Sequence, residues 1–360
     1  MKHTRKRTAR GISFLLTLAL LAGALACLPL TALAEGGGFV YTVYEGEAII
    51  LQAYGLSGEV VIPSVLDGAP VTTIWDFAFY NCKGMTGLVI PETVRAFREE
   101  DSTFGVFFGC DALVRFTVSE RNPSYYAEGD CLIEKATGRL IRGGNLPEPV
   151  IPKGVKVIGD WAFDGCDRLT RVTLPEGVTA IGDGAFSNCD NLKSVTIPNS
   201  VKSIGTSAFV WCRALENVTI PNGVTHIGNT AFACSGLTEV TLPKGIQEMG
   251  KGVFSTCRNL SAVYCNAASQ PTGWNADWMA DCPAVVLWGH SGSFSGLLGD
   301  LGGNGGIDAT DYLFLKRFCL GTLALTDAQK AVSDINGDGK INSLDYLLIK
   351  RHVLGTYKIG

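Results

Sequence analysis

A repeat of about 23 residues fills the middle of the chain and limits its fold more than any other feature. Each regular copy opens with Ile-Pro or Leu-Pro, and these prolines are Pro152, Pro175, Pro198, Pro221 and Pro243. The first four are spaced by 23 residues and the fifth follows after 22. Two looser copies come earlier, around Cys82 and Cys110. A unit this short cannot bury its own apolar side, so the copies must stack, and the period predicts a solenoid.

The pattern within one copy predicts short parallel strands. Each copy follows Cys-x-x-Leu-x-x-Val-x-Ile, in which Val195 and Ile197 alternate as in a strand that is buried on one face. Pro198 ends this strand because it has no N–H to donate. Ala208 and Phe209 are expected to supply one helical or 3₁₀ turn that returns the chain. Stacking would place the strands about 4.8 Å apart in a parallel sheet. The predicted class is an α+β solenoid with parallel strands and short helical turns.

These repeats resemble the BspA-like leucine-rich repeats of bacterial surface proteins. The resemblance implies a solenoid over residues 35–288, with an opening cap, a closing cap and a hairpin insertion at 120–148. The family is a fold with varied partners, so the resemblance implies binding without naming a ligand.

The chain has 12 cysteines, and most of them share one repeat position. Three residues before the leading Leu or its counterpart stand Cys82, Cys110, Cys166, Cys189, Cys212, Cys234 and Cys257. A small residue stacked from turn to turn predicts buried, reduced thiols. Cys265 stands where other copies have Ile or Leu, so we expect it in the core. A disulfide between Cys265 and Cys282 is the open alternative.

The first 34 residues have the three-part order of a secretory signal. Met1–Arg10 is basic, an apolar run follows, and Ala32-Leu33-Ala34 supplies small residues before cleavage at Glu35. An uncleaved anchor and a lipoprotein at Cys27 are the alternatives. No second apolar run approaches the roughly 20 residues of a membrane span. We therefore expect a secreted protein, extracellular or held at the cell surface through a scaffold, with no membrane span after cleavage.

Charge argues against a nucleic-acid partner. The formal net charge of the chain is −4. The predicted signal holds five basic residues and no acid, so its removal leaves 25 Lys and Arg against 34 Asp and Glu, a net charge of −9. A chain this acidic repels the phosphate backbone, so we expect no nucleic-acid binding.

A calcium-loop motif at 334–345 follows a short Gly- and Ser-containing linker at 289–298. Oxygen-bearing side chains stand at loop positions 1, 3, 5, 9 and 12, with Gly339 at position 6. Calcium takes about six to eight oxygen ligands, and glycine permits the sharp turn that wraps the loop around the ion. The predicted ligands are the side chains of Asp334, Asn336, Asp338, Asn342 and Asp345 and the backbone carbonyl of Lys340.

A second copy of the motif lies 34 residues earlier, at 300–311. Its predicted ligands are the side chains of Asp300, Asn304, Asp308 and Asp311 and the carbonyl of Gly306. Position 3 is Gly302, which removes one side-chain ligand, and the additional glycines must be ordered on binding. We therefore expect this loop to bind Ca²⁺ more weakly than 334–345. A vestigial loop without calcium is the alternative.

The duplicated loop and helix resemble a type I dockerin, the calcium-dependent plug of cellulosomal proteins, over residues 299–360. The resemblance implies a small all-α module with paired EF-hand-like loops, two Ca²⁺ sites, and a cohesin module of a scaffold protein as partner. It implies that loop positions 10, 11, 17 and 18 face the cohesin: Ala309, Thr310, Lys316 and Arg317, then Ser343, Leu344, Lys350 and Arg351. Cys319 aligns with Val353 and is expected in the helix core. Without the resemblance, the Lys-Arg pairs would be interpreted as solvated helix faces.

The solenoid carries little that points to catalysis. The chain has four histidines and no nucleophile-elbow, Walker or dinucleotide-binding motif. Outward strand positions form a candidate ligand face: Arg171, Thr173, Ser194, Thr196, Asn217, Thr219, Glu239, Thr241 and Tyr264. Strand propensity alone also explains the threonine column. We expect a non-catalytic protein whose solenoid recognises a protein or glycan. The alternatives are an enzyme subunit acting on plant polysaccharide and a cell-surface adhesin.

Overall fold

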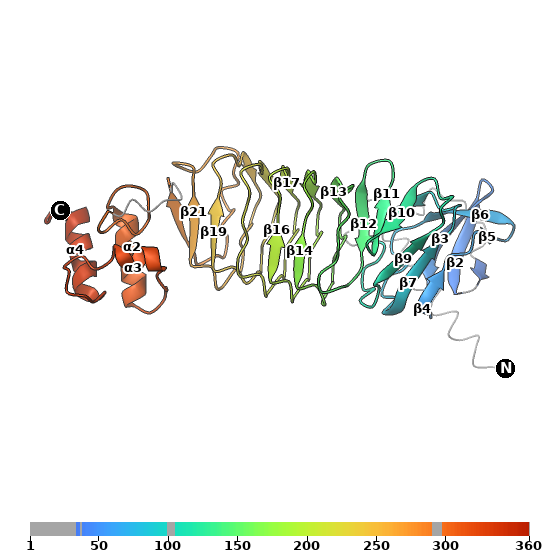
Figure 1. Cartoon of the computed structure of the whole chain (residues 1–360), viewed down its shortest axis with the longest axis horizontal. Coiled ribbons are helices and arrows are strands. Elements are labelled where there is room, and N and C mark those ends of the chain that lie inside the picture. The colour runs from blue at the N-terminus through green and yellow to red at the C-terminus, as the bar shows by residue number, and fades with distance from the viewer. Residues whose placement is uncertain (1–33, 37, 99–104, 290–296, 360) are drawn as a thin grey trace.

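The computed structural model describes residues 34–36, 38–98, 105–289 and 297–359. Figure 1 shows an elongated stack of strands with a small helical module beyond its C-terminal end. The predicted signal segment, apart from Ala34, and most of the predicted linker lie outside the described residues.

The stack opens with two sheets. The first contains β1 (Ala34–Gly36), β2 (Phe39–Tyr44), β3 (Glu47–Ala53), β5 (Val65–Leu66), β6 (Ala69–Ile74) and β8 (Ala96–Phe97). The second contains β4 (Ser57–Val61), β7 (Gly84–Ile90) and β9 (Arg115–Val118), all parallel. The β2–β3 pair is an antiparallel hairpin, whereas β3 and β6 pair in parallel. The hairpin thus closes the end of the stack, and the parallel turns begin behind it.

An eight-stranded sheet runs along one side of the solenoid. It starts with the antiparallel strands β10 (Tyr125–Glu128), β11 (Cys131–Glu134) and β12 (Arg139–Gly143), within the predicted hairpin insertion. It continues in parallel with β13 (Val157–Ile158), β15 (Ala180–Ile181), β17 (Ser203–Ile204), β18 (His226–Ile227) and β20 (Glu248–Met249). The returning segment is therefore a two-residue strand followed by hydrogen-bonded turns. The expected helical turn does not occur in the described solenoid residues.

Parallel strands, most of them predicted from Val-x-Ile, form the other side of the solenoid. They are β14 (Arg171–Thr173), β16 (Ser194–Thr196), β19 (Glu239–Leu242), β21 (Ala262–Cys265) and β22 (Val285–Trp288). Equivalent residues pair in parallel, for example Thr173 with Thr196 and Thr241 with Tyr264. The segment 217–219 forms no strand, so this side is split between β16 and β19. The parallel stacking is as predicted, with a break that the repeat pattern does not reveal.

A column of phenylalanines runs through the core. Phe163, Phe186, Phe209, Phe232 and Phe254 are fully buried. Their rings stack from turn to turn with centroids 5.1–5.7 Å apart. Trp278 ends the column with an edge contact to Phe254 at 6.1 Å. Each turn thus supplies one ring that its two neighbours cover.

The cysteine column also lies in the core, with one correction. The Sγ atoms of Cys110, Cys189, Cys212 and Cys257 lie 3.0–3.1 Å from a phenylalanine carbonyl of the preceding turn, to which they donate. In the irregular copy this place is taken by Ser235, whose hydroxyl lies 3.3 Å from the Cys257 thiol. Cys234 is therefore one residue off the column, contrary to prediction. All cysteines in the described residues are free thiols, so Cys265 and Cys282 are not bonded.

These buried thiols are expected to be unreactive in the native protein. Burial raises the pKa of Cys110 to about 12 and that of Cys166 to about 11, and the thiolate is the reacting form. We expect Ellman's reagent at pH 8 to titrate Cys319 rapidly and the column only after denaturation. A Cys319→Ser variant should lose the fast phase, and several fast thiols in that variant would contradict the account. Because folding raises the pKa of these thiols, their protonated form stabilises the folded chain. This stabilisation is fully present below the thiol pKa of the unfolded chain and is lost as the pH rises toward 12.

The C-terminal module has three helices around a small core. They are α2 (Ala309–Cys319), α3 (Asp327–Ala331) and α4 (Ser343–Val353). Phe314, Leu315 and Ile349 are fully buried in it. Cys319, by contrast, is exposed and not in the helix core as expected. The module is all-helical, as predicted.

Candidate functional site

The loop at 334–345 is held closed by its first and last carboxylates. The Asp334 oxygens accept the N–H groups of Asp338 at 3.1 Å and Gly339 at 2.8 Å. Asp345 is fully buried, and its oxygens accept the N–H groups of Ile335 at 2.8 Å and Asn342 at 2.9 Å. Asp345 thereby joins the start of the loop to the N-terminus of α4.

The side chain at loop position 9 also starts the helix. Asn342 is the N-cap of α4 and accepts the N–H of Leu344, while Asp345 returns the bond to the N–H of Asn342. This capping box satisfies backbone donors that the first turn of a helix leaves free. Gly339 at position 6 has a φ of 78°, in the left-handed region that favours glycine. Glycine at this position therefore allows the turn that the motif requires.

The loop at 300–311 repeats this geometry. Asp300 accepts the N–H groups of Asn304 at 3.1 Å and Gly305 at 2.9 Å. Asp311 is fully buried and accepts the N–H groups of Gly302 and Asp308, each at 2.7 Å. Burial, together with the charges of Asp308 and Asp300, raises the pKa of Asp311 to about 7. A bound cation would stabilise the charged form of the Asp311 carboxylate and so offset the cost of its burial.

The donor chemistry of both loops fits calcium. Each loop supplies carboxylate, amide and carbonyl oxygens, which are the ligands of a hard divalent cation. In the described residues no three Asp, Glu, His or Cys side chains gather as a metal cluster. The loop oxygens instead accept backbone N–H groups. The ligand sets at 334–345 and 300–311 therefore stay predictions.

The two loop–helix units contact each other through equivalent residues. Tyr312 of α2 and Tyr346 of α4 stack with ring centroids 5.0 Å apart, and their hydroxyls are hydrogen-bonded at 2.9 Å. Because Tyr312 and Tyr346 occupy the same position in the two copies, equivalent residues of α2 and α4 lie on equivalent helix faces.

The residues predicted to face a cohesin are not equally placed in the two copies. Ser343, Leu344, Lys350 and Arg351 of α4 are all exposed. In α2, Ala309 and Lys316 are exposed, whereas Thr310 and Arg317 are half-buried. Arg317 donates to the backbone carbonyl of Ser261 in the solenoid at 3.4 Å. The first copy therefore contacts the solenoid at one of its predicted partner positions.

The predicted ligand face of the solenoid is open except at its last member. Arg171, Thr173, Thr196, Asn217, Thr219 and Thr241 are exposed, and Ser194 and Glu239 are half-buried. Tyr264 is only 7% exposed and accepts a hydrogen bond from Gln329 of the helical module at 3.2 Å. Tyr264 is therefore not an open ligand position, because the helical module covers it.

A shallow groove of about 350 Å³ with a mixed polar and apolar lining lies on this face, next to the break in the strands. Asn217, Thr219, Glu239 and Thr241 line it, with Asn222 and Asn266 from the adjoining loops. Asn266 is not among the predicted ligand-face residues, although it continues the every-second-residue alternation of Ala262 and Tyr264. Nothing in the repeat pattern marks Asn222. Amide, hydroxyl and carboxylate groups in one groove suit a polar ligand.

The solenoid tryptophans divide between core and surface. Trp274 and Trp278 are buried in the closing cap. Trp211 is 41% exposed, and the Arg213 guanidinium lies 5.0 Å from its ring centroid.

Among the residues that the structure describes, none of the helices has the length and hydropathy of a transmembrane span.

Comparison with known families matches both parts of the chain. The model of the BspA type leucine-rich repeat region matches six copies over residues 61–128 and 142–261. The model of the type I dockerin domain matches residues 298–354. A search among curated proteins finds no match.

Solved structures share the solenoid fold. The pneumococcal vaccine antigen PcpA is 21% identical with a TM-score of 0.54, and the match covers 62% of this chain and 56% of that one. The chain thus spans little more than half of that structure. A leucine-rich repeat protein from Bacteroides ovatus is 24% identical with a TM-score of 0.45, and the match covers 71% of each chain.

Proposed function

Because the chain belongs to the BspA type leucine-rich-repeat family and ends in a type I dockerin domain, we propose that it is a secreted, non-catalytic binding protein that attaches to a cohesin on a cellulosome-type scaffold. The observation that supports this most is the pair of like-built loops, each closed by a buried aspartate at position 12. Bound calcium would neutralise the carboxylates that each loop gathers. The loops would then hold α2 and α4 in the orientation that a partner recognises.

The solenoid is proposed to carry the cargo-binding surface. Its outward strand face and the groove between Asn217 and Asn266 combine amide, hydroxyl and carboxylate groups with apolar surface from residues such as Val240 and Pro243, a mixture that suits a glycan or a protein segment. Binding of the mature chain to a glycan array distinguishes these two ligand classes.

Calcium-dependent binding to a cohesin is the test of the attachment. The mature chain, residues 35–360, is titrated against a panel of cohesins in calcium and again after chelation. We expect at least one cohesin to bind in calcium and to be released by the chelator. Binding that survives chelation, or no binding to any member of a broad panel, would contradict the proposed attachment.

A further inference from the structure

The dockerin rests on the last two turns of the solenoid. One cluster of buried apolar residues joins Ala262, Tyr264 and Leu287 of β21 and β22 to dockerin residues such as Leu301 and Phe314. In β21 the alternate residues Val263 and Cys265 face the solenoid core instead. The dockerin therefore covers the outward strand face of these turns, at the end of the stack seen in Figure 1.

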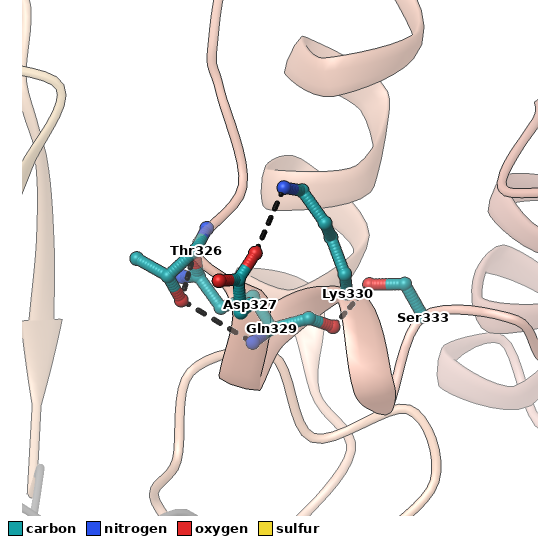
Figure 2. A network of polar contacts seen from close by, with 5 residues as sticks. All are labelled: Thr326, Asp327, Gln329, Lys330 and Ser333. Atoms are coloured by element: carbon teal, nitrogen blue, oxygen red, sulfur yellow. Dashed lines mark hydrogen bonds and ion pairs between the residues drawn. The ribbon is translucent and has the colours of Figure 1, made fainter.

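A fully bonded glutamine fixes this contact. Gln329 of α3 is 1% exposed, and its side-chain oxygen accepts the N–H of Thr326 at 2.9 Å within a capping box. Figure 2 shows this network, in which Ser333 also donates to the Gln329 carbonyl at 2.6 Å. The two protons of the Gln329 amide are left for the Tyr264 hydroxyl at 3.2 Å and the Leu301 carbonyl at 3.3 Å. The capping box thus aims one amide proton at the solenoid, and loss of the Tyr264 hydroxyl would leave a buried donor unpaired.

The contact engages α2 and leaves α4 open. Arg317 of α2 donates to the Ser261 carbonyl, whereas its counterpart Arg351 of α4 is exposed and lies 5.8 Å from the ring centroid of Tyr357. In Figure 1, α2 and α3 lie between the solenoid and α4, which is at the far end of the molecule. A large partner seated over the C-terminal half of α2 would meet the solenoid.

The open helix also carries the more apolar surface. Leu344, Leu347 and Leu354 of the α4 copy are 55%, 45% and 66% exposed. With Arg351 they follow the spacing of one helix face. The counterpart of Leu344 in the first copy is Thr310, so the α2 copy has one exposed leucine fewer. A leucine stripe beside Lys350 and Arg351 suits a partner surface with apolar contacts and acidic groups.

We propose that the solenoid, through its contacts with Arg317 and α3, blocks a cohesin from the first of the two related faces of the dockerin, and that a cohesin therefore binds this chain through α4 alone. This inference rests on the proposed cohesin attachment. It assigns the partner to Leu344, Leu347, Lys350 and Arg351 and makes Arg317 part of the internal contact.

Matched double variants of the mature chain test which face binds. Lys350→Ala with Arg351→Ala is expected to weaken cohesin binding more than 100-fold. Lys316→Ala with Arg317→Ala, the equivalent change in the first copy, is expected to stay within about threefold of the unchanged chain. Equal losses, or the larger loss from the first-copy pair, overturn the inference. No cohesin binding by the unchanged chain overturns the proposed attachment and with it this assignment of the partner.

A second measurement tests the internal contact without any cohesin. Phenylglyoxal modifies accessible arginines, and mass spectrometry compares the rates at Arg317 and Arg351 in the calcium-loaded chain. We expect Arg351 to react several times faster, and Gln329→Leu or Tyr264→Phe to bring the two rates together. Equal rates in the unchanged chain would show that the solenoid does not cover α2, and would overturn the inference even if a cohesin binds.

Discussion

Replacing Asp345 with alanine is expected to abolish tight calcium binding at 334–345 and, with it, binding to a cohesin. The carboxylate is fully buried and bonded to the N–H groups of Ile335 and Asn342. Its loss removes a predicted ligand and leaves these donors unpaired, at about 1–3 kcal/mol for each buried group. Since loss of a residue that merely supports a ligand costs about 10–100-fold in metal affinity, we expect more than about 100-fold here, measured by calorimetric calcium titration of the mature chain.

Two variants control this prediction. Asp327→Ala removes an exposed acid of α3 that pairs with Lys330 at 3.1 Å, and it should leave calcium binding unchanged. Asp311→Ala makes the same change in the first loop and should remove the weaker calcium site while the tighter one remains. Equal loss from Asp327→Ala would mean that overall charge, and not the loop, governs binding.

Replacing Phe209 with alanine is expected to destabilise the solenoid by about 3–5 kcal/mol, because the site lies between two other rings and cannot collapse. Phe209 is fully buried and stacks on Phe186 and Phe232, at 5.2 Å on each side. Urea unfolding followed by tryptophan fluorescence measures the loss. Since each turn contacts only its neighbours, hydrogen exchange should rise first in these three turns.

Trp211 supplies the matched control within the same turn. Its ring is 41% exposed and contacts Arg213 at the surface. Trp211→Ala should therefore cost less than about 1 kcal/mol. Similar losses from the two variants would be inconsistent with a core organised around the phenylalanine column.

The sequence predicts the features that depend on the residues within one repeat and its immediate neighbours. Val-x-Ile becomes a parallel strand at Arg171–Thr173 and Ser194–Thr196 because one face must be buried against the next turn. The position-12 aspartates are buried because loop spacing and helix capping act locally. The sequence does not predict the returning strand Ser203–Ile204, since two residues become a strand only when neighbouring turns pair with them.

The features that the sequence does not predict depend on contacts between distant segments. Tyr264 occupies an outward strand position, and it is buried in a cluster with dockerin residues more than 30 positions further along the chain. Arg317 is indistinguishable from Arg351 in the motif until the solenoid contacts one of them. Ser235 takes the column position of Cys234 because a one-residue deletion can be placed on either side of that position.

A calorimetric titration decides whether calcium makes this chain bind a cohesin. A cohesin selected from the panel is titrated into the mature chain in calcium, and the titration is repeated after chelation. We expect one cohesin per chain in calcium and no measurable heat without it. The same affinity in both conditions would contradict this expectation.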